Sequence, residues 1–181
     1  HSTGNFDIAE FGGKPKQVAI PHPNFQKKYM KNLSDNREMF PDFQITIEAT
    51  HHGPTALEKP SIFIEIGTTQ KEWNDIELCN QVSEIILKTV ENPISNYPYA
   101  ICFGGTHYSE KFSNELINGK FALGTVMPKH SLDLLNESLF SHIISRNIGV
   151  KAALLDYKSL GKNKQKILDF LSETNLEVIK L

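Results

Sequence analysis

From residue 43 to the end of the chain, strand-like runs alternate with segments long enough to form helices. Two runs, 43–50 and 61–66, combine strand spacing with β-branched residues. Shorter apolar runs cover 99–103, 121–127, 150–155 and 176–181, and helical spacing covers 25–33, 69–90, 132–143 and 164–171. Strands separated by helices form βαβ units with right-handed crossovers. The sequence therefore predicts an α/β fold with a mixed, largely parallel sheet and helices on both faces.

Composition limits the class of protein. With 181 residues the chain can bury a sizeable core, so we expect residues 1–181 to form a single α/β domain. No apolar run approaches the roughly 20 residues that a membrane helix needs. Cys79 and Cys102 lie in apolar contexts, which favours reduced thiols in a cytoplasmic protein over a disulfide or a metal thiolate. A formal net charge of -2 argues against binding nucleic acid by bulk electrostatics but allows a local basic patch.

Polar or glycine-rich residues follow one predicted strand after another. These segments are His51-His52-Gly53-Pro54-Thr55, Gly67-Thr68-Thr69, Gly104-Gly105-Thr106-His107-Tyr108, Pro128-Lys129-His130 and Asp156-Tyr157-Lys158. The carboxyl ends of parallel strands meet at one edge of a sheet, where ligands of open α/β sheets bind. The sequence therefore predicts that these residues share one pocket.

Each candidate also has a structural alternative. Adjacent His51 and His52 point to opposite sides of an extended chain, so one is expected to face the pocket while the other makes a structural hydrogen bond. Glu48 is either a surface carboxylate or a group that orients a histidine. His107 follows Gly104 and Gly105, whose amide N–H groups are candidate oxyanion donors; the alternative is a simple glycine turn.

The sequence evidence for a metal site and for a phosphate-binding site is weaker than the evidence for a shared pocket. Glu65 lies inside an apolar strand, where a carboxylate faces solvent or is held by a partner such as a metal ion. Histidine and carboxylate groups suit zinc, but no HExxH spacing is present, and neither is a GxSxG, Walker or GxGxxG motif. Lys129 and His130 fit a solvated loop. Lys158, Lys162, Lys164 and Lys166 fit a solvated helix start or a phosphate-binding patch.

The run 48–55, with 63–69 and Trp73, resembles the archaeal and plant D-aminoacyl-tRNA deacylase family. Further matching segments are 1–5, 12–15, 103–108, 124–130 and 156–160, so the resemblance covers essentially the whole chain in the same order. Thr106 departs from the glycine or proline that the family often has. The family also usually has a β-rich segment before the residues matching His1, so we expect this chain to lack that N-terminal segment.

The resemblance implies a phosphorylase/hydrolase-like fold, akin to peptidyl-tRNA hydrolases. It also implies a zinc-dependent proofreading hydrolase that cleaves the ester between a D-amino acid and the terminal ribose of tRNA. The partner would be the acceptor end of D-aminoacyl-tRNA, and we expect a monomer that makes no contact with membranes.

The matching positions supply the expected site. They are His51, His52, His107 and Glu48 for catalysis, Thr55, Gly104, Gly105, Lys129 and His130 for substrate binding, and His51, Glu65 and His107 for metal. Lys158, Lys162, Lys164 and Lys166 are expected to contact tRNA. The alternatives are a peptidyl-tRNA hydrolase, a zinc-dependent hydrolase or phosphorylase of small metabolites, and a catalytically silent tRNA-binding module.

Overall fold

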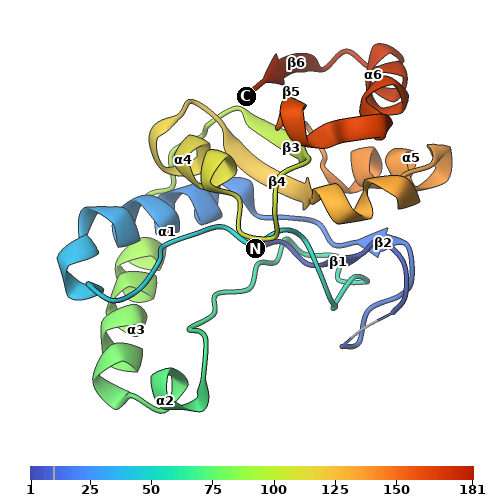
Figure 1. Ribbon diagram of the computed structural model, residues 1–181. Helices are drawn as coiled ribbons and strands as arrows, with labels where there is room; N and C mark the ends of the chain where they lie inside the picture. The colour runs from blue at the N-terminus through green and yellow to red at the C-terminus, as the bar shows by residue number, and fades with distance from the viewer. Residues whose placement is uncertain (10) are drawn as a thin grey trace.

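The computed structural model describes residues 1–9 and 11–181 and places four parallel strands in a central sheet of order β4-β3-β5-β6 (Figure 1). β3 (Tyr99–Phe103) lies between β4 (Ala122–Met127) and β5 (Ala152–Leu155), and β6 (Glu177–Lys180) pairs with β5 at the edge. Every residue of β4 and β5 is buried. Continuous apolar strands of this kind are typical of parallel sheets covered on both faces.

Helices cover both faces of the sheet, as predicted. Successive strand residues point to opposite faces, so Ile101 and Phe103 share one core cluster and Ala100 and Cys102 another. The first cluster includes side chains from α5 (Glu137–Arg146) and α6 (Lys164–Ser172). The second includes side chains from α1 (Pro23–Asp35) and α4 (Glu110–Asn118).

The predicted helix over 69–90 is two helices. α2 (Gln70–Trp73) begins with a capping box formed by Thr69 and Glu72, which confirms that part of the prediction. α3 (Ile76–Glu91) then begins anew at Asp75, whose carboxylate accepts from the Leu78 N–H group at 3.1 Å. α3 packs on α1 rather than on the sheet, through a third apolar cluster of Tyr29, Phe40, Leu78 and Ile85.

The two strands predicted before residue 70 are extended segments outside the sheet. Segment 43–50 forms isolated backbone contacts and no continuous ladder with the other described residues. Its Ala49 N–H group donates to the His107 carbonyl at 2.7 Å, and its Thr50 N–H group donates to the Val126 carbonyl at 2.9 Å. Segment 61–66 is attached through Phe63 N–H to the His1 carbonyl at 2.8 Å. A strand needs a continuous ladder of such bonds with a neighbour, which a strand-like side-chain pattern does not by itself supply.

The remaining elements are short. β1 (Gly4–Asn5) and β2 (Gln17–Val18) form a small antiparallel pair that the sequence did not predict. The 3₁₀ helices are η1 (Arg37–Met39), η2 (Lys129–Leu134) and η3 (Tyr157–Asn163). η2 takes the first part of the predicted helix over 132–143, because Asn136 starts α5 as a new N-cap. Cys79 and Cys102 are free thiols, and no helix among the described residues is long and apolar enough to cross a membrane.

Candidate active site

Two histidines and one glutamate from distant parts of the sequence meet beyond the C-terminal end of β3. His107 lies in the loop that follows β3, and Glu48 and His51 lie on the extended segment 43–51 beside it. The rings of His51 and His107 are 4.7 Å apart between centroids. The predicted proximity of these two histidines is therefore confirmed.

Glu48 interacts with both rings. One carboxylate oxygen, Oε2, lies 3.2 Å from Nε2 of His107 and 3.6 Å from Nε2 of His51. Nδ1 of His51 lies 2.9 Å from the Ala49 carbonyl oxygen and so carries a hydrogen, which leaves Nε2 with a lone pair in the neutral ring. Burial lowers the pKa of His51, and the neighbouring His52 and His107 lower it further. A neutral His51 can accept a proton or bind a metal ion.

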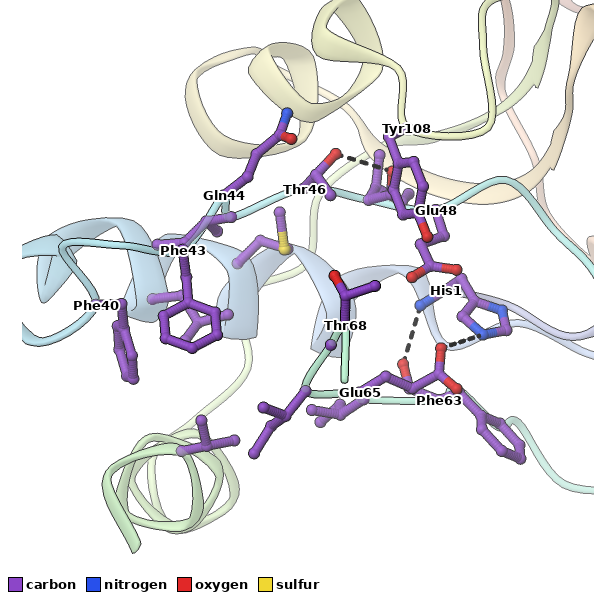
Figure 2. Close-up of a pocket in the computed structure, with 18 of the residues that line it drawn as sticks. His1, Phe40, Phe43, Gln44, Thr46, Glu48, Phe63, Glu65, Thr68 and Tyr108 are labelled. Atoms are coloured by element: carbon purple, nitrogen blue, oxygen red, sulfur yellow. Dashed lines mark hydrogen bonds and ion pairs between the residues drawn. The ribbon is translucent and has the colours of Figure 1, made fainter. Parts of the chain in front are cut away.

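His1 is a site residue that the sequence analysis missed. Its ring stacks on His51 with centroids 4.1 Å apart. Its Nε2 lies 3.2 Å from a Glu65 carboxylate oxygen, a contact marked by a dashed line in Figure 2. The sequence places His1 in a polar, turn-like segment, from which nothing predicts a buried ring. The one signal that pointed to it was that residues 1–5 match the family pattern.

The donor atoms form two groups that share His51. One group contains His1, His51, His52 and Glu65, and the other contains Glu48, His51 and His107, with the donor atoms of each group within 4.8 Å of one another. The expected metal ligands His51, Glu65 and His107 therefore do not form one group. Glu65 belongs to the group that contains His1, whereas His107 belongs to the group that contains Glu48.

The donor set suits zinc. Nδ1 of His1, His51 and His52 each faces a backbone carbonyl oxygen, at 2.9, 2.9 and 2.6 Å, so each ring can present Nε2 to the site. This is the usual arrangement of zinc-binding histidines, whose other ring nitrogen is fixed by a hydrogen bond. In addition, Nε2 of His1 is buried without a hydrogen-bond partner in the described chain, although a carboxylate oxygen lies beside it. A cation between the two would satisfy both atoms.

The amides of Gly104 and Gly105 are not oxyanion donors in this structure. Gly104 N–H donates to the Met127 carbonyl at 2.9 Å, and Gly105 N–H donates to the Ser159 hydroxyl at 2.6 Å. Both glycines have positive φ, 97° and 74°, a conformation that costs glycine little. Their observed contribution is to turn the chain sharply after β3, so that His107 reaches Glu48.

The other expected substrate-binding residues lie around this centre. Thr55 is buried, and its hydroxyl accepts from the Lys14 N–H group at 2.9 Å. Lys129 and His130 are exposed at the start of η2, next to Gly105, whose carbonyl accepts from the Lys129 N–H group at 2.9 Å.

The C-terminal lysines contact η2 and η3 rather than the histidines. Lys162 pairs with Asp133 at 3.0 Å, and the Lys166 ammonium donates to the Leu132 carbonyl at 2.9 Å. Lys164 lies 4.3 Å from the centre of the Tyr157 ring, and Lys158 is exposed. Three of these four cations therefore already have partners within the chain.

A cavity of about 620 Å³ opens beside the histidines. The extended segments 42–48 and 62–69 line it together with side chains of α1 and α3, and much of its surface is aliphatic (Figure 2). His1, Glu48, Glu65 and Tyr108 also line it. Partial burial and the nearby Glu48 and Glu65 raise the pKa of Tyr108, so its phenol remains a hydrogen-bond donor. The cavity is thus apolar within and acidic where it meets the histidines.

A parallel α/β sheet with a histidine–carboxylate cluster beyond its strand ends defines a protein equipped to activate water for hydrolysis. Residues 1–179 match the family model described as D-aminoacyl-tRNA deacylase. The chain belongs to this family, whose members are hydrolases acting on the ester bond of aminoacyl-tRNA.

Individual relatives agree with this assignment. A D-aminoacyl-tRNA deacylase of Cenarchaeum symbiosum is 55% identical over 179 residues, which are 99% of this chain and 69% of the relative. The enzyme of Archaeoglobus fulgidus is 32% identical over 99% of this chain and 65% of its own length. A crystal structure described as a conserved protein of unknown function superposes with a TM-score of 0.92 at 31% identity, covering 99% of this chain and 64% of that one. The chain thus spans about two thirds of the length of these relatives.

Proposed function

We propose that this chain hydrolyses the ester between a D-amino acid and the 3′-terminal ribose of tRNA at the cluster of Glu48, His51 and His107. The observation that carries the proposal is the convergence of two histidines on one carboxylate beside a cavity with an acidic mouth. A carboxylate that contacts imidazole orients the ring and stabilises the imidazolium that forms when the ring takes a proton.

The reaction needs one water and one proton acceptor. The water oxygen bonds to the ester carbonyl carbon while a histidine Nε2 takes its proton, and the bond to the ribose oxygen breaks as that oxygen receives the proton. His51 is suited to the acceptor role because burial, with a smaller effect of its histidine neighbours, lowers its pKa and so favours the neutral ring. His107 is held by Glu48 at 3.2 Å, which positions its ring beside His51. The phenol of Tyr108 is a hydrogen-bond donor at the mouth of the cavity and can stabilise negative charge on the carbonyl oxygen.

Zinc is the alternative to a histidine base in this proposal, because a ring whose Nε2 holds the metal ion cannot also take a proton at that atom. The residues that would hold it are His51 with Glu48 and His107, or His51 with His1, His52 and Glu65. Zinc held by these residues would lower the pKa of water to about 7 and so would supply hydroxide at neutral pH. Chelation followed by zinc titration tests this step. We expect His51→Ala to weaken zinc binding, since His51 belongs to both groups; unchanged binding would refute the assignment.

The cavity is proposed to hold the aminoacyl group. The carboxylates of Glu48 and Glu65 attract the α-ammonium, and the apolar walls accept the side chain. Discrimination against the L-form requires that its side chain collide with a wall when the ammonium and the ester are in place. Because the mouth of the cavity fixes both the α-ammonium and the ester, only one enantiomer of the amino acid directs its side chain into the cavity.

The remaining expectations complete the proposal. Thr55, Gly104 and Gly105 shape the loops around the substrate, and Lys129 and His130 lie where they can meet the ribose and its phosphate. Lys158, Lys162, Lys164 and Lys166 contact tRNA further out. The working protein is proposed to be a cytoplasmic monomer in which residues 1–181 form one domain.

A comparison of three substrates separates this function from its rivals. D-aminoacyl-tRNA should be cleaved, whereas N-acetyl-L-aminoacyl-tRNA, the substrate type of a peptidyl-tRNA hydrolase, should be spared. A simple D-amino-acid ester should be cleaved with a much higher KM, because it lacks the tRNA. Preference for the N-acetyl substrate, equal turnover without tRNA, or binding of tRNA with no release of amino acid would each refute the proposal.

A further inference from the structure

We propose that loop 11–16, in the connection between β1 and β2, binds the single-stranded 3′ end of tRNA, with Phe11 stacked on the terminal base. This inference rests on the proposed function, since it adds a place for the nucleotide to the site that cleaves the ester. The loop contains one aromatic residue, two glycines and two lysines, in the order Phe11-Gly12-Gly13-Lys14-Pro15-Lys16.

Phe11 is the outer member of a row of aromatic rings that leads away from the reacting centre. Its side chain is 83% exposed, although it contacts the His52 ring with centroids 5.8 Å apart. His52 in turn lies 4.5 Å from His51 and 4.8 Å from Phe63. An exposed phenylalanine ring costs free energy in water, whereas a ring beside a reacting ester offers a stacking surface to an unpaired base.

The loop is fixed against the site. Lys14 N–H donates to the Thr55 hydroxyl at 2.9 Å, and its carbonyl accepts from the Asn5 amide at 3.4 Å. Gly13 and Gly53 pack so closely that a Cβ on Gly53 would lie 2.2 Å from the Gly13 nitrogen. These contacts tie the position of Phe11 to the segment that carries His51 and His52, so the stacking surface keeps a set distance from the ester.

The charges decide which side of the histidines takes the nucleotide. On the cavity side lie Glu48 and Glu65, which repel phosphate and suit the ammonium group. On the loop side Lys14 and Lys16 are exposed, and neither these lysines nor Phe11 lines the cavity. An ester held between the two sides therefore directs its amino acid into the cavity and its nucleotide toward loop 11–16.

The loop and the C-terminal lysines occupy different parts of the surface. In Figure 1 the connection between β1 and β2 projects at the lower right, whereas α6 lies at the upper right. Three of the C-terminal lysines also have partners within the chain. Loop 11–16 is thus a separate binding surface beside the histidines.

A fluorescent RNA tests the stacking without requiring catalysis. The probe is an RNA hairpin that ends in ACCA and carries no amino acid. Its terminal adenine is replaced by 2-aminopurine, a fluorescent base whose emission falls when it stacks. We expect the wild-type chain to bind and quench it, Phe11→Ala to weaken binding by about tenfold with loss of quenching, and Phe11→Trp to retain both. Trp73→Ala removes an aromatic side chain that is 54% exposed on α2 and should change neither.

The lysines are tested by salt dependence. Replacing Lys14 and Lys16 together by alanine should reduce the slope of log K against log salt by about 1.4, the value for two neutralised phosphates of a single strand. An unchanged affinity and quenching for Phe11→Ala, or no quenching by the wild-type chain, would overturn the inference. Quenching by a wild-type chain that releases no D-amino acid from charged tRNA would instead refute the proposed function and leave the stacking surface standing.

Discussion

Glu48 contacts His107 and His51, at 3.2 and 3.6 Å, and its side chain is 21% exposed. The change Glu48→Gln keeps its size but removes the charge that holds the two rings. We expect a loss of about 10- to 100-fold in kcat/KM for deacylation, the usual effect of removing a group that orients a metal ligand or base. Glu84→Gln on the exposed side of α3 is the matched control. Activity within twofold of the wild type would show that Glu48 is a surface carboxylate, the alternative left open by the sequence.

His51 and His107 meet as predicted, but not for the predicted reason. Segment 43–50 lies outside the sheet and reaches the His107 loop through an isolated antiparallel bridge between Glu48 and Tyr108, rather than as a parallel strand. The burial of His1 could not be predicted, because it depends on segment 61–66 folding back so that Phe63 pairs with it. The engagement of the Gly104 and Gly105 amides by Met127 and Ser159 likewise depends on segments that are distant in the sequence.

At the scale of elements, one lysine joins α1 to the end of α4. Lys27 is 1% exposed, and its ammonium donates to the carbonyls of Leu116, Gly119 and Phe121 at 2.7, 2.8 and 3.0 Å. These carbonyls lie in the last turn of α4 and just after it, where they lack helical partners. Burial lowers the pKa of Lys27 to about 8.

The change Lys27→Met should destabilise the protein by about 1–3 kcal/mol, because it leaves buried carbonyls without a donor. Lys31→Met, one turn further along α1, removes a longer hydrogen bond of 3.5 Å to the Ile117 carbonyl and should change stability by less than about 0.5 kcal/mol. Urea denaturation followed by circular dichroism measures both. Equal effects of the two variants would contradict this account of Lys27.

The C-terminal lysine cluster gives a second prediction at this scale. Replacing Lys162, Lys164 and Lys166 by alanine should weaken tRNA binding and flatten its salt dependence, with a slope change of about 0.9 for each duplex phosphate that is no longer neutralised. Because these three cations have partners in the chain, we expect a slope change smaller than the value for three phosphates. An unchanged slope would return the cluster to its alternative, a solvated helix start.

Elements were predictable from the sequence where one segment determines its own structure. Strands β3, β4 and β5 are continuous apolar runs, and the capping box at the start of α2 lies within residues 69–72, so both were predicted. Segments 43–50 and 61–66 have a strand pattern but no neighbour that pairs with them residue by residue in the described chain. Strand formation depends on that neighbour, which the local pattern does not contain.

At the scale of the whole molecule, burial of histidines couples stability to pH. His22, His51 and His142 each have a pKa lowered below 6.5, in each case mainly by burial. Below pH 6.5 the unfolded chain therefore binds more protons than the folded chain. Stability should be unaffected by these groups above that pH and should fall as pH decreases through it.

His142 offers a way to test this coupling away from the active site. Its Nε2 lies 3.0 Å from the Val18 nitrogen, whose N–H group donates to the neutral ring, and 3.3 Å from the Val18 carbonyl oxygen, and burial lowers its pKa. The free energy of unfolding should decrease between about pH 7.5 and about pH 5.5, and it should decrease less in His142→Gln, which has no titrating ring. A wild-type stability that is constant or greater at the lower pH would contradict the prediction.

The central claim is that the cluster of Glu48, His51 and His107 cleaves D-aminoacyl-tRNA. The most direct test is single-turnover release of D-tyrosine from charged tRNA by the wild-type chain and by His51→Ala and His107→Ala, with L-tyrosyl-tRNA alongside and circular dichroism to show folding. We expect the wild-type chain to release the D-form rapidly and not the L-form, and we expect both folded variants to lose about 10²- to 10⁴-fold, the usual value of a positioned acid–base group. Near-normal release by both variants, or release of the L-form at the same rate, would contradict it.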